Sequence, residues 1–297
     1  VAFNLESIIQ VVLNRMLTVI FIVTLNDMDF YATSLVKTVI NHIKLYKNNF
    51  FSRKGHSANH LQIRQQLLSD PNFRTLKTIM KTNIFKILAS LPKTIYFNLR
   101  CLPFRQAIRL PFFICYNVRL GDIGGSQLKN NCTPKPFMIK YGLGGVKGID
   151  SNRSQLWLQD GTVTFNGRAN FAEGFSIRCN GNLSFGDNFG GGKNGFISCA
   201  DEISFGDDIL FAWNGTIRDS DGHTIYVDGH EKPSHKPVHI GNHVWIASEV
   251  KILKGVSIAD GCVIALGSIV TKSFDEENIL IGGFPAKKIQ ENVSWKG

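Results

Sequence analysis

"IGNHVWIASEVKILKGVSIADGCVIALGSI", residues 240–269, repeats one pattern every six residues. Isoleucine opens each hexad and a small or β-branched residue follows four positions later, at Ile240/Val244, Ile246/Val250, Ile252/Val256, Ile258/Cys262 and Ile264/Ser268. A helix would space apolar residues by three and four, and a simple hairpin would space them by two. A six-residue period is typical of a coil of short strands, with the aliphatic side chain inward and the small residue at a tight turn.

Weaker copies of the repeat lie upstream, with aromatic residues in place of isoleucine. They begin at Phe165, Phe171 and Ile177 and again at Phe205, Phe211 and Ile217. We interpret the aromatics as a wider filling of the same core. Because a solenoid buries its core only by stacking coils, several turns are required. The pattern predicts a mainly β solenoid over residues 151–290.

One segment interrupts the repeat. "RDSDGHTIYVDGHEKPSHKPVHIG", residues 218–241, loses the six-residue phase and carries His223, His230, His235 and His239. Insertions in repeat proteins emerge as loops on one face, which is often the binding face. We therefore expect a loop excursion over residues 223–238.

The chain before the solenoid has a different composition. Residues 1–100 show helical periodicity with few glycines, and residues 101–150 read as a lead-in segment. Residues 1–150 hold 20 Lys and Arg against 6 Asp and Glu, whereas residues 151–297 hold 13 against 17. A basic half suits anionic lipid headgroups, an acidic glycan or nucleic acid, or is a solvated surface. Because no nucleic-acid-binding motif is recognisable, we expect no nucleic-acid partner.

The apolar segment at residues 7–25 is interrupted by Gln10, Asn14 and Arg15. A spanning helix needs ~20 mostly apolar residues, so a buried or membrane-surface amphipathic helix is expected. The segment has no basic n-region and no small-residue cleavage site, so it is a poor signal peptide. The six cysteines show no CxxC pair, which predicts reduced thiols. These features predict a cytoplasmic protein with peripheral contact to the inner face of an anionic membrane.

The repeat and its flanking motifs resemble the hexapeptide-repeat acyltransferases, whose fold is a left-handed parallel β-helix. The resemblance covers roughly residues 150–290 and rests on "VWI", "GSIVTK" and "GGFPAK" together with "RDSDGH" before the excursion. These motifs are similar to those of the maltose, galactoside and polysaccharide O-acetyltransferases. The resemblance implies transfer of an acetyl group from acetyl-CoA to a sugar hydroxyl of a cell-surface or capsular polysaccharide or its precursor. It also implies a homotrimer with sites between adjacent subunits, and no required metal.

The resemblance assigns His223 to the catalytic position. Direct acyl transfer needs a base for the hydroxyl, and a histidine with a pKa near 7 suits that role. Asp219 or Asp221 would hold the imidazole tautomer, or both would be turn formers. Trp245 matches a tryptophan that packs against the acceptor sugar or the pantetheine arm, and a core tryptophan is the alternative.

The coenzyme A positions are assigned by the same resemblance. The pantetheine arm would pass Ser248, Ala265 and Leu266, and the phosphates would approach Thr271, Lys272 and Lys287. The chain departs from the family pattern in having "VWIA" for "VWIG" and "IALGS" for a "GAGS" run, and the bulkier Leu266 alters the arm's path. At the place of a family substrate-binding asparagine the chain has Gly192, with Asn194 two residues on, which leaves the acceptor open.

Two rival functions use the same fold. A zinc-dependent carbonic anhydrase would hold its metal on three imidazoles. The histidines from His230 to His239, however, lie in a segment broken by Pro and Gly rather than at equivalent coil positions. A non-catalytic glycan-binding scaffold would keep the coil but would not need His223 together with the C-terminal motifs.

Overall fold

The computed structural model describes residues 71–124 and 127–297, with the side chains of residues 71–84 outside the description. The chain divides into two compact units, Val1–Ala89 and Ser90–Gly297. The boundary falls inside the helix α4 (Pro71–Cys101), which is followed by the short helix α5 (Phe104–Ala107). The helical prediction for residues 1–70, including residues 7–25, lies outside the described residues. No described helix is both long and apolar enough to cross a membrane.

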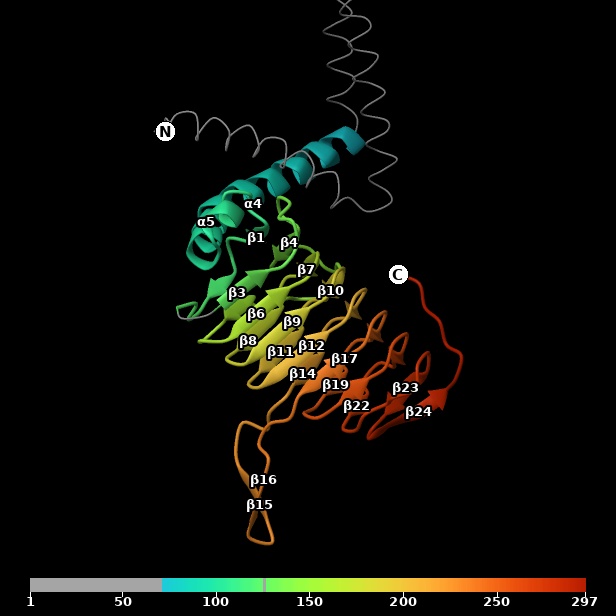
Figure 1. Ribbon diagram of the computed structural model, residues 1–297. Helices are drawn as coiled ribbons and strands as arrows, with labels where there is room; N and C mark the ends of the chain where they lie inside the picture. Colours follow the sequence, from blue (N-terminus) through green and yellow to red (C-terminus); the bar gives the residue numbers. More distant parts are fainter. Residues whose placement is uncertain (1–70, 125–126) are drawn as a thin grey trace, which may run out of the picture. The chain divides into compact units, whose positions relative to one another are not determined.

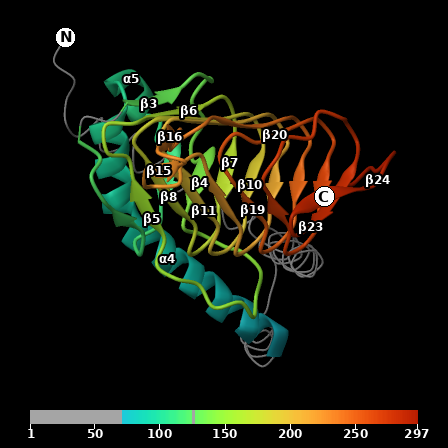
Figure 2. The same ribbon diagram turned by 90° about the horizontal axis from the view of Figure 1, so that it is seen from below.

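The second unit is a three-sided parallel β-helix (Figures 1 and 2). Sheet A contains β1 (Phe112–Ile114), β4 (Ile139–Tyr141), β7 (Ala169–Phe171), β10 (Phe189–Gly191), β13 (Leu210–Phe211), β18 (Trp245–Ile246), β21 (Val263–Ile264), β23 (Leu280–Gly283) and β24 (Ala286–Gln290). Sheet B contains β2 (Arg119–Leu120), β5 (Gln155–Trp157), β8 (Ser176–Cys179), β11 (Phe196–Cys199), β14 (Thr216–Arg218), β19 (Lys251–Ile252) and β22 (Ile269–Val270). Sheet C contains β3 (Gln127–Asn130), β6 (Thr162–Phe165), β9 (Asn182–Phe185), β12 (Glu202–Phe205), β17 (Val238–Ile240) and β20 (Ser257–Ile258).

Each complete coil contributes one strand to each sheet, and the chain turns at an A/B, a B/C and a C/A corner. The last coil joins sheet C only through a bridge between Ile258 and Phe274. Neighbouring strands within each sheet are parallel, except that the final strand β24 runs antiparallel to β23. The predicted left-handed parallel β-helix is therefore confirmed as the fold class. Between β14 and β17 the chain leaves the coil and forms a separate hairpin of β15 (Ile225–Val227) and β16 (His230–Lys232).

The β-helix begins earlier than the sequence indicates. The segment divided off as a lead-in, residues 101–150, contains β1 to β4, and these strands belong to the three sheets. Two features make the six-residue period hard to recognise in residues 101–150. A long loop, residues 142–154, separates β4 from β5. Corner residues of the upstream coils pair 20 positions apart, whereas those near the C-terminus pair 18 apart.

The core is built of columns of like side chains. Phe165, Phe185 and Phe205 stack with centroid distances of 5.0 and 5.3 Å, and the column continues as Ile240 and Ile258. All are buried. The aromatics therefore occupy the isoleucine positions of the repeat, as predicted. Burial of large apolar side chains supplies the main stabilisation of the coil.

A ladder of side chains fixes the C/A corner. The Asp187 amide donates to Asp207 (2.7 Å), the Asp207 amide to Asn242 (2.8 Å) and the Asn242 amide to Asp260 (2.7 Å). The residue before each of the three amide donors is glycine, and a Cβ on Gly206 would lie 2.5 Å from Asn242 Oδ1. Side-chain oxygens thus satisfy amides that a tight turn exposes.

Helix α4 closes the first edge of sheet A. Asn98 accepts from the Phe112 amide (3.1 Å) and donates to its carbonyl (2.8 Å), and Thr94 makes the equivalent pair with Ile114 (3.0 and 3.1 Å). Ser90 accepts from the Tyr116 amide (2.9 Å). These three residues, four apart on one helical face, replace a neighbouring strand along β1 and so block edge pairing.

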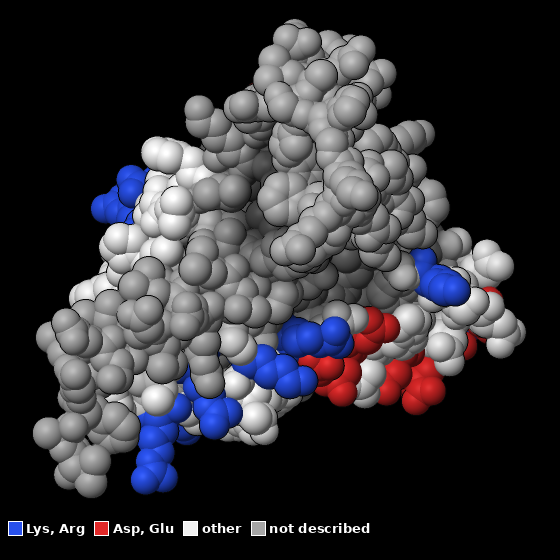
Figure 3. Space-filling view, turned by 90° about the horizontal axis from the view of Figure 1, so that it is seen from above, with Lys and Arg blue, Asp and Glu red and all other residues white. Residues whose placement is uncertain are grey.

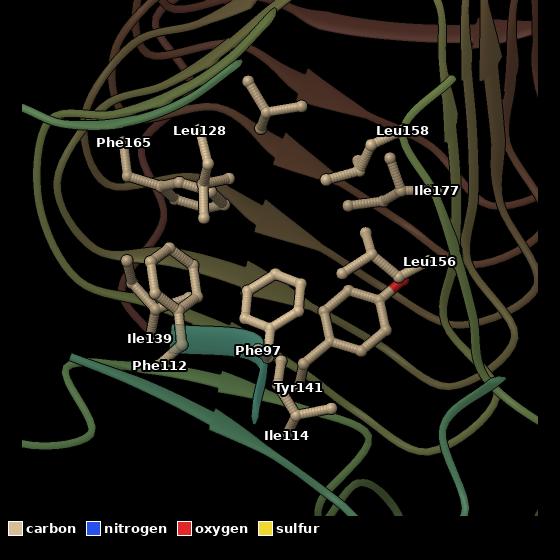
Figure 4. Close-up of a pocket in the computed structure, with 11 residues that line it drawn as sticks. Phe97, Phe112, Ile114, Leu128, Ile139, Tyr141, Leu156, Leu158, Phe165 and Ile177 are labelled. Atoms are coloured by element: carbon tan, nitrogen blue, oxygen red, sulfur yellow. The ribbon is translucent and has the colours of Figure 1, made fainter. Parts of the chain in front are cut away.

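The same helix plugs the end of the core. Phe97 is buried and lies between Phe112 and Tyr141 (Figure 4). The space left among the surrounding apolar side chains is about 10 Å³, which is close to the minimum for one water molecule. The open end of the solenoid is therefore filled by the helix.

We expect Asn98→Ala to lower the free energy of unfolding by about 2–4 kcal/mol, because the buried amide and carbonyl of Phe112 lose their partner. Denaturant unfolding measures the change. Asn170→Ala, an exposed change on β7, is the matched control, with an expected effect under about 0.5 kcal/mol. Equal effects of the two changes would show that the edge contact contributes nothing.

Ionised Asp187 is expected to account for part of the loss of folding stability at low pH. Hydrogen bonds from Arg168 hold the pKa of Asp187 at about 2, below its ordinary value of 3.8. Its stabilising contribution is present above the unfolded pKa and is lost as the pH falls toward about 2. We expect Asp187→Asn to flatten the decline of the unfolding midpoint between pH 4 and pH 2. Unchanged pH dependence in this variant would contradict the assignment.

Candidate functional site

His223 lies where the chain leaves the coil at the B/C corner. β14 ends at Arg218, and the exposed His223 follows Gly222, which has a φ of +81°. The Gly222 amide donates to Ser220 Oγ at 3.0 Å, so a local turn directs the chain outward. The β15–β16 hairpin then projects away from the coils (Figure 1).

The base of the excursion is held by several contacts. The Asp221 amide donates to the Ser234 carbonyl (2.8 Å) and the Lys236 amide to the Asp219 carbonyl (2.9 Å). Lys254, one coil further, donates to the Pro233 carbonyl (2.5 Å) and pairs with Asp221 (2.5 Å). His223 is therefore an exposed residue, and the segment that carries it is held in place by these contacts.

The two aspartates near His223 have other partners. Asp219 is fully buried, and its carboxylate accepts from the Ala200 amide (2.8 and 3.0 Å) and the Asp201 amide (2.7 Å). Asp221 forms its ion pair with Lys254. No hydrogen bond joins His223 to either carboxylate in this described segment. The contacts of Asp219 are those of a turn former at the point where the coil opens.

The remaining histidines of the excursion are separated. His230 lies in β16, His235 contacts Ser234 (3.1 Å), and His239 on sheet C contacts Ser204 Oγ (2.7 Å). Among the described residues, no three His, Cys, Asp or Glu side chains converge on a point that could hold a metal ion. The arrangement of imidazoles that the carbonic anhydrase alternative needs is not assembled by these residues within one chain.

Trp245 lies on sheet A and is 37% exposed. Trp295, from the C-terminal segment, lies 6.2 Å from it and stacks on His243 at 4.3 Å. His243 also contacts Asp208 (2.5 Å), and this hydrogen bond lowers the pKa of Asp208. This cluster is not predictable from the repeat, because Trp295 follows the last repeat and has no periodic partner.

The residues predicted to bind coenzyme A lie in three places. Ser248, Ala265 and Leu266 meet at the A/B corner, where the Gly267 amide donates to the Ser248 carbonyl (3.0 Å). Thr271 and Lys272 are exposed at the B/C corner, beyond β22. Lys287 is exposed on β24, opposite Gly282.

The structure thus brings together some of the predicted residues and separates others. His223, Thr271 and Lys272 share the B/C corner, because the strands before them, β14 and β22, are both in sheet B with β19 between them. Trp245 belongs to sheet A, across the core from that corner. A site that uses both Trp245 and His223 is therefore not assembled within one chain.

Comparison with known proteins points to acetyltransferases. No family model matches the chain. Galactoside O-acetyltransferase of Escherichia coli K12 is 37% identical over 115 residues, which are 37% of this chain and 54% of that protein. A putative acetyltransferase of Saccharomyces cerevisiae is 36% identical over 112 residues, or 37% of this chain and 56% of that protein. The chain spans about half the length of these curated relatives.

Solved structures with lower similarity include a polysialic-acid-specific acetyltransferase. It is 20% identical with a TM-score of 0.38, and the match covers 63% of this chain and 89% of that one. A galactoside acetyltransferase in complex with coenzyme A is 23% identical with a TM-score of 0.32, covering 70% and 80%. The predicted resemblance is confirmed by the curated relatives: the chain is similar to acetyltransferases, among them galactoside O-acetyltransferase.

Proposed function

We propose that the protein transfers an acetyl group from acetyl-CoA to a hydroxyl of a sugar, with His223 as the general base. The observation that carries the proposal is the common corner: exposed His223 stands at the B/C corner that also presents Thr271 and Lys272. A proton acceptor and a cation for phosphate are then on one edge of the solenoid. The similarity to galactoside O-acetyltransferase supports the same activity.

The reaction requires one base and no covalent enzyme intermediate. His223 takes the proton of the acceptor hydroxyl, and the oxygen attacks the thioester carbonyl. The carbon–sulfur bond then breaks, and the protonated imidazole returns its proton to the departing thiolate. The acetyl group has moved from sulfur to oxygen and the hydroxyl proton has moved to the thiolate, so the products are the acetyl ester and coenzyme A.

The C-terminal coils fit an extended pantetheine arm. Leu266 is 68% exposed at the A/B corner and Thr271 is exposed at the B/C corner. Five Cα-to-Cα steps separate these positions, so they lie at most ~18 Å apart, which a long flexible arm can follow along β22. The thioester would then lie at the A/B corner, where His223 of an adjacent copy would reach it in the trimer proposed below. Leu266 offers apolar contact to the arm, and Lys272 offers charge to the phosphates. Lys287 would serve the phosphates from β24.

A neighbouring subunit would complete the site. Trp245 and His223 lie on opposite sides of one core, so the tryptophan that packs against substrate would come from an adjacent copy. We propose a homotrimer in which the B/C corner of one subunit meets sheet A of the next. The partly exposed Trp245 on that sheet supports such a contact.

Asp219 would act on His223 only through the turn it holds. Its carboxylate is occupied by two amides of the preceding coil, which keeps the exit of the excursion in place. Asp221 would restrain the loop through Lys254. Both are positioning residues in this proposal.

We expect Asp219→Ala to lower the free energy of unfolding by about 2–3 kcal/mol, because two amides lose their acceptor. Asp221→Ala breaks a partly exposed ion pair and should cost about 0–1 kcal/mol. Denaturant unfolding compares the two variants. The opposite order of the two effects would show that Asp221 holds the corner.

We expect His223→Ala to reduce acetyl transfer by about 10²–10⁴-fold, because the acceptor hydroxyl loses its base. The assay uses labelled acetyl-CoA and a panel of glycan acceptors. His230→Ala, in the exposed hairpin, is the control and should retain activity.

The same variants separate the scaffold alternative from the enzyme. Full transfer by His223→Ala would refute the base assignment. Failure of the unmodified protein to bind acetyl-CoA in a calorimetric titration would leave the non-catalytic glycan-binding scaffold as the function.

A further inference from the structure

A groove opens on sheet B, far along the solenoid from the C-terminal motifs. It has a volume of about 610 Å³ and is lined by β5, β8 and β11 together with the loop of residues 142–154. The residues predicted from the sequence for catalysis and coenzyme A binding all lie elsewhere, and Asn194, two residues after the place of a family substrate-binding asparagine, lines the groove. The function proposed above therefore leaves it unexplained.

The loop that forms one wall is fixed to the coil. Lys193 donates to the Ile149 carbonyl (2.9 Å), and Asn194 donates to the Asp150 carbonyl (2.9 Å). Asn194 Oδ1 accepts from the Asn152 amide (2.9 Å), in a position that a Cβ on Gly174 would obstruct at 2.1 Å. The wall is therefore part of the folded structure.

The groove combines cations with flat apolar surfaces. The Arg153 side chain is oriented by its hydrogen bond to the Asn117 carbonyl (2.8 Å) and lines the groove beside exposed Arg178. The ring of Trp157 lies over Gly121, where a Cβ would be 2.4 Å from it, and the Arg119 guanidinium is 5.5 Å from the ring centroid. Such a mixture suits a ligand with anionic groups and C–H faces.

The positive charge continues along sheet B. The seven strands of this sheet contain Arg119, Arg178, Arg218 and Lys251 and no Asp or Glu. Sheet C carries Glu202, and the face seen in Figure 3 presents acidic and basic side chains beside one another. The strands of sheet A also carry cations without Asp or Glu, at Lys140, Lys287 and Lys288. What distinguishes sheet B is that its cations are mostly arginines and that Arg178 lies beside Trp157.

We propose that sheet B binds an extended anionic glycan, a polysaccharide carrying carboxylate or sulfate groups, whose hydroxyls are acetylated at the B/C corner. The proposal rests on the function proposed above for His223. Arginine pairs bidentately with carboxylate and sulfate groups, and sugar rings pack on Trp157 and on Phe196, which is 38% exposed.

The path of the polymer follows from the order of the strands. Three strand spacings of ~4.8 Å separate β5 from β14, a distance of ~14 Å along the sheet. An oligosaccharide of several sugar rings is long enough to cover it. β14 leads directly to the exit that carries His223. A chain seated in the groove would thus extend toward the proposed transfer site.

The test measures binding of size-matched oligosaccharides to the full chain: polygalacturonate, a sulfated heparin fragment and neutral dextran. We expect both anionic ligands to bind at least about tenfold tighter than dextran, with affinity falling as salt rises. Comparison of the two anionic ligands identifies which charged group the groove prefers. Equal binding of dextran would overturn the proposal, as would tighter binding of a single-stranded RNA of equal charge.

Substitutions localise the site. Arg178→Gln and Trp157→Ala should each weaken anionic glycan binding by about tenfold, the effect of one charge-assisted hydrogen bond or one ring contact. Lys129→Gln removes the same charge from exposed β3 on sheet C and should change binding less than twofold. An equal effect of Lys129→Gln would show that only net charge matters.

His223→Ala separates this inference from the proposed function. The variant should lose acetyl transfer and bind the anionic glycan as tightly as the unmodified protein. If the unmodified protein binds the glycan but transfers no acetyl group, the proposed function is wrong, whereas the assignment of the groove as an anionic-glycan binding site is retained. If it acetylates neutral acceptors and prefers no anionic chain, the groove assignment fails alone.

Discussion

In-register stacking of the coils is the constraint on which this structure depends. Every inward side chain must sit above its counterpart in the previous coil, as Phe165, Phe185 and Phe205 do. A change of phase within a strand would place polar side chains in the core, so extra residues are accommodated at corners or outside the coil. In sheet B, Phe196 pairs with Thr216, which pairs with Lys251, and in sheet C, Ser204 pairs with His239, which pairs with Ser257. The step from sheet B to sheet C is therefore eight positions in the upstream coil (196 to 204) and six in the C-terminal coil (251 to 257), so the additional residues lie at the B/C corner. The excursion that carries His223 leaves from the same corner.

The sequence predicts the part of the fold in which that constraint is expressed by residue type. Isoleucine at six-residue intervals locates the last coils, and the aromatics at Phe165 and Phe171 are correctly placed in the same core. The first coils are not predicted, because the long loop of residues 142–154 removes the period there. The capping by α4 was also not predicted, since Ser90, Thr94 and Asn98 pair with β1 through side chains rather than through a strand pattern.

The candidate site shows the same division. The break in phase marks His223 from sequence alone, because a histidine at the end of an in-phase coil is a local feature. The partners of Asp219 are not predictable in this way, since its carboxylate reaches Ala200 and Asp201 in the previous coil, and a turn of the solenoid separates them in sequence. The separation of Trp245 from His223 likewise depends on which sheet each strand enters. Motif order along the chain does not contain that information.

In a solenoid, each sheet presents its own set of outward-facing side chains, and sheet B presents arginines. In a parallel coil, outward positions of one sheet repeat in register, so a charge on one coil has neighbours of the next coil beside it at strand spacing. Arg178, Ser198 and Arg218 follow one another in this way. Arg178 and Arg218 lie two strand spacings apart, ~10 Å, because Ser198 stands between them. A long anionic chain can contact both arginines at once, whereas a small ligand contacts one. The repeat geometry therefore supports the proposed polymeric acceptor over a single sugar.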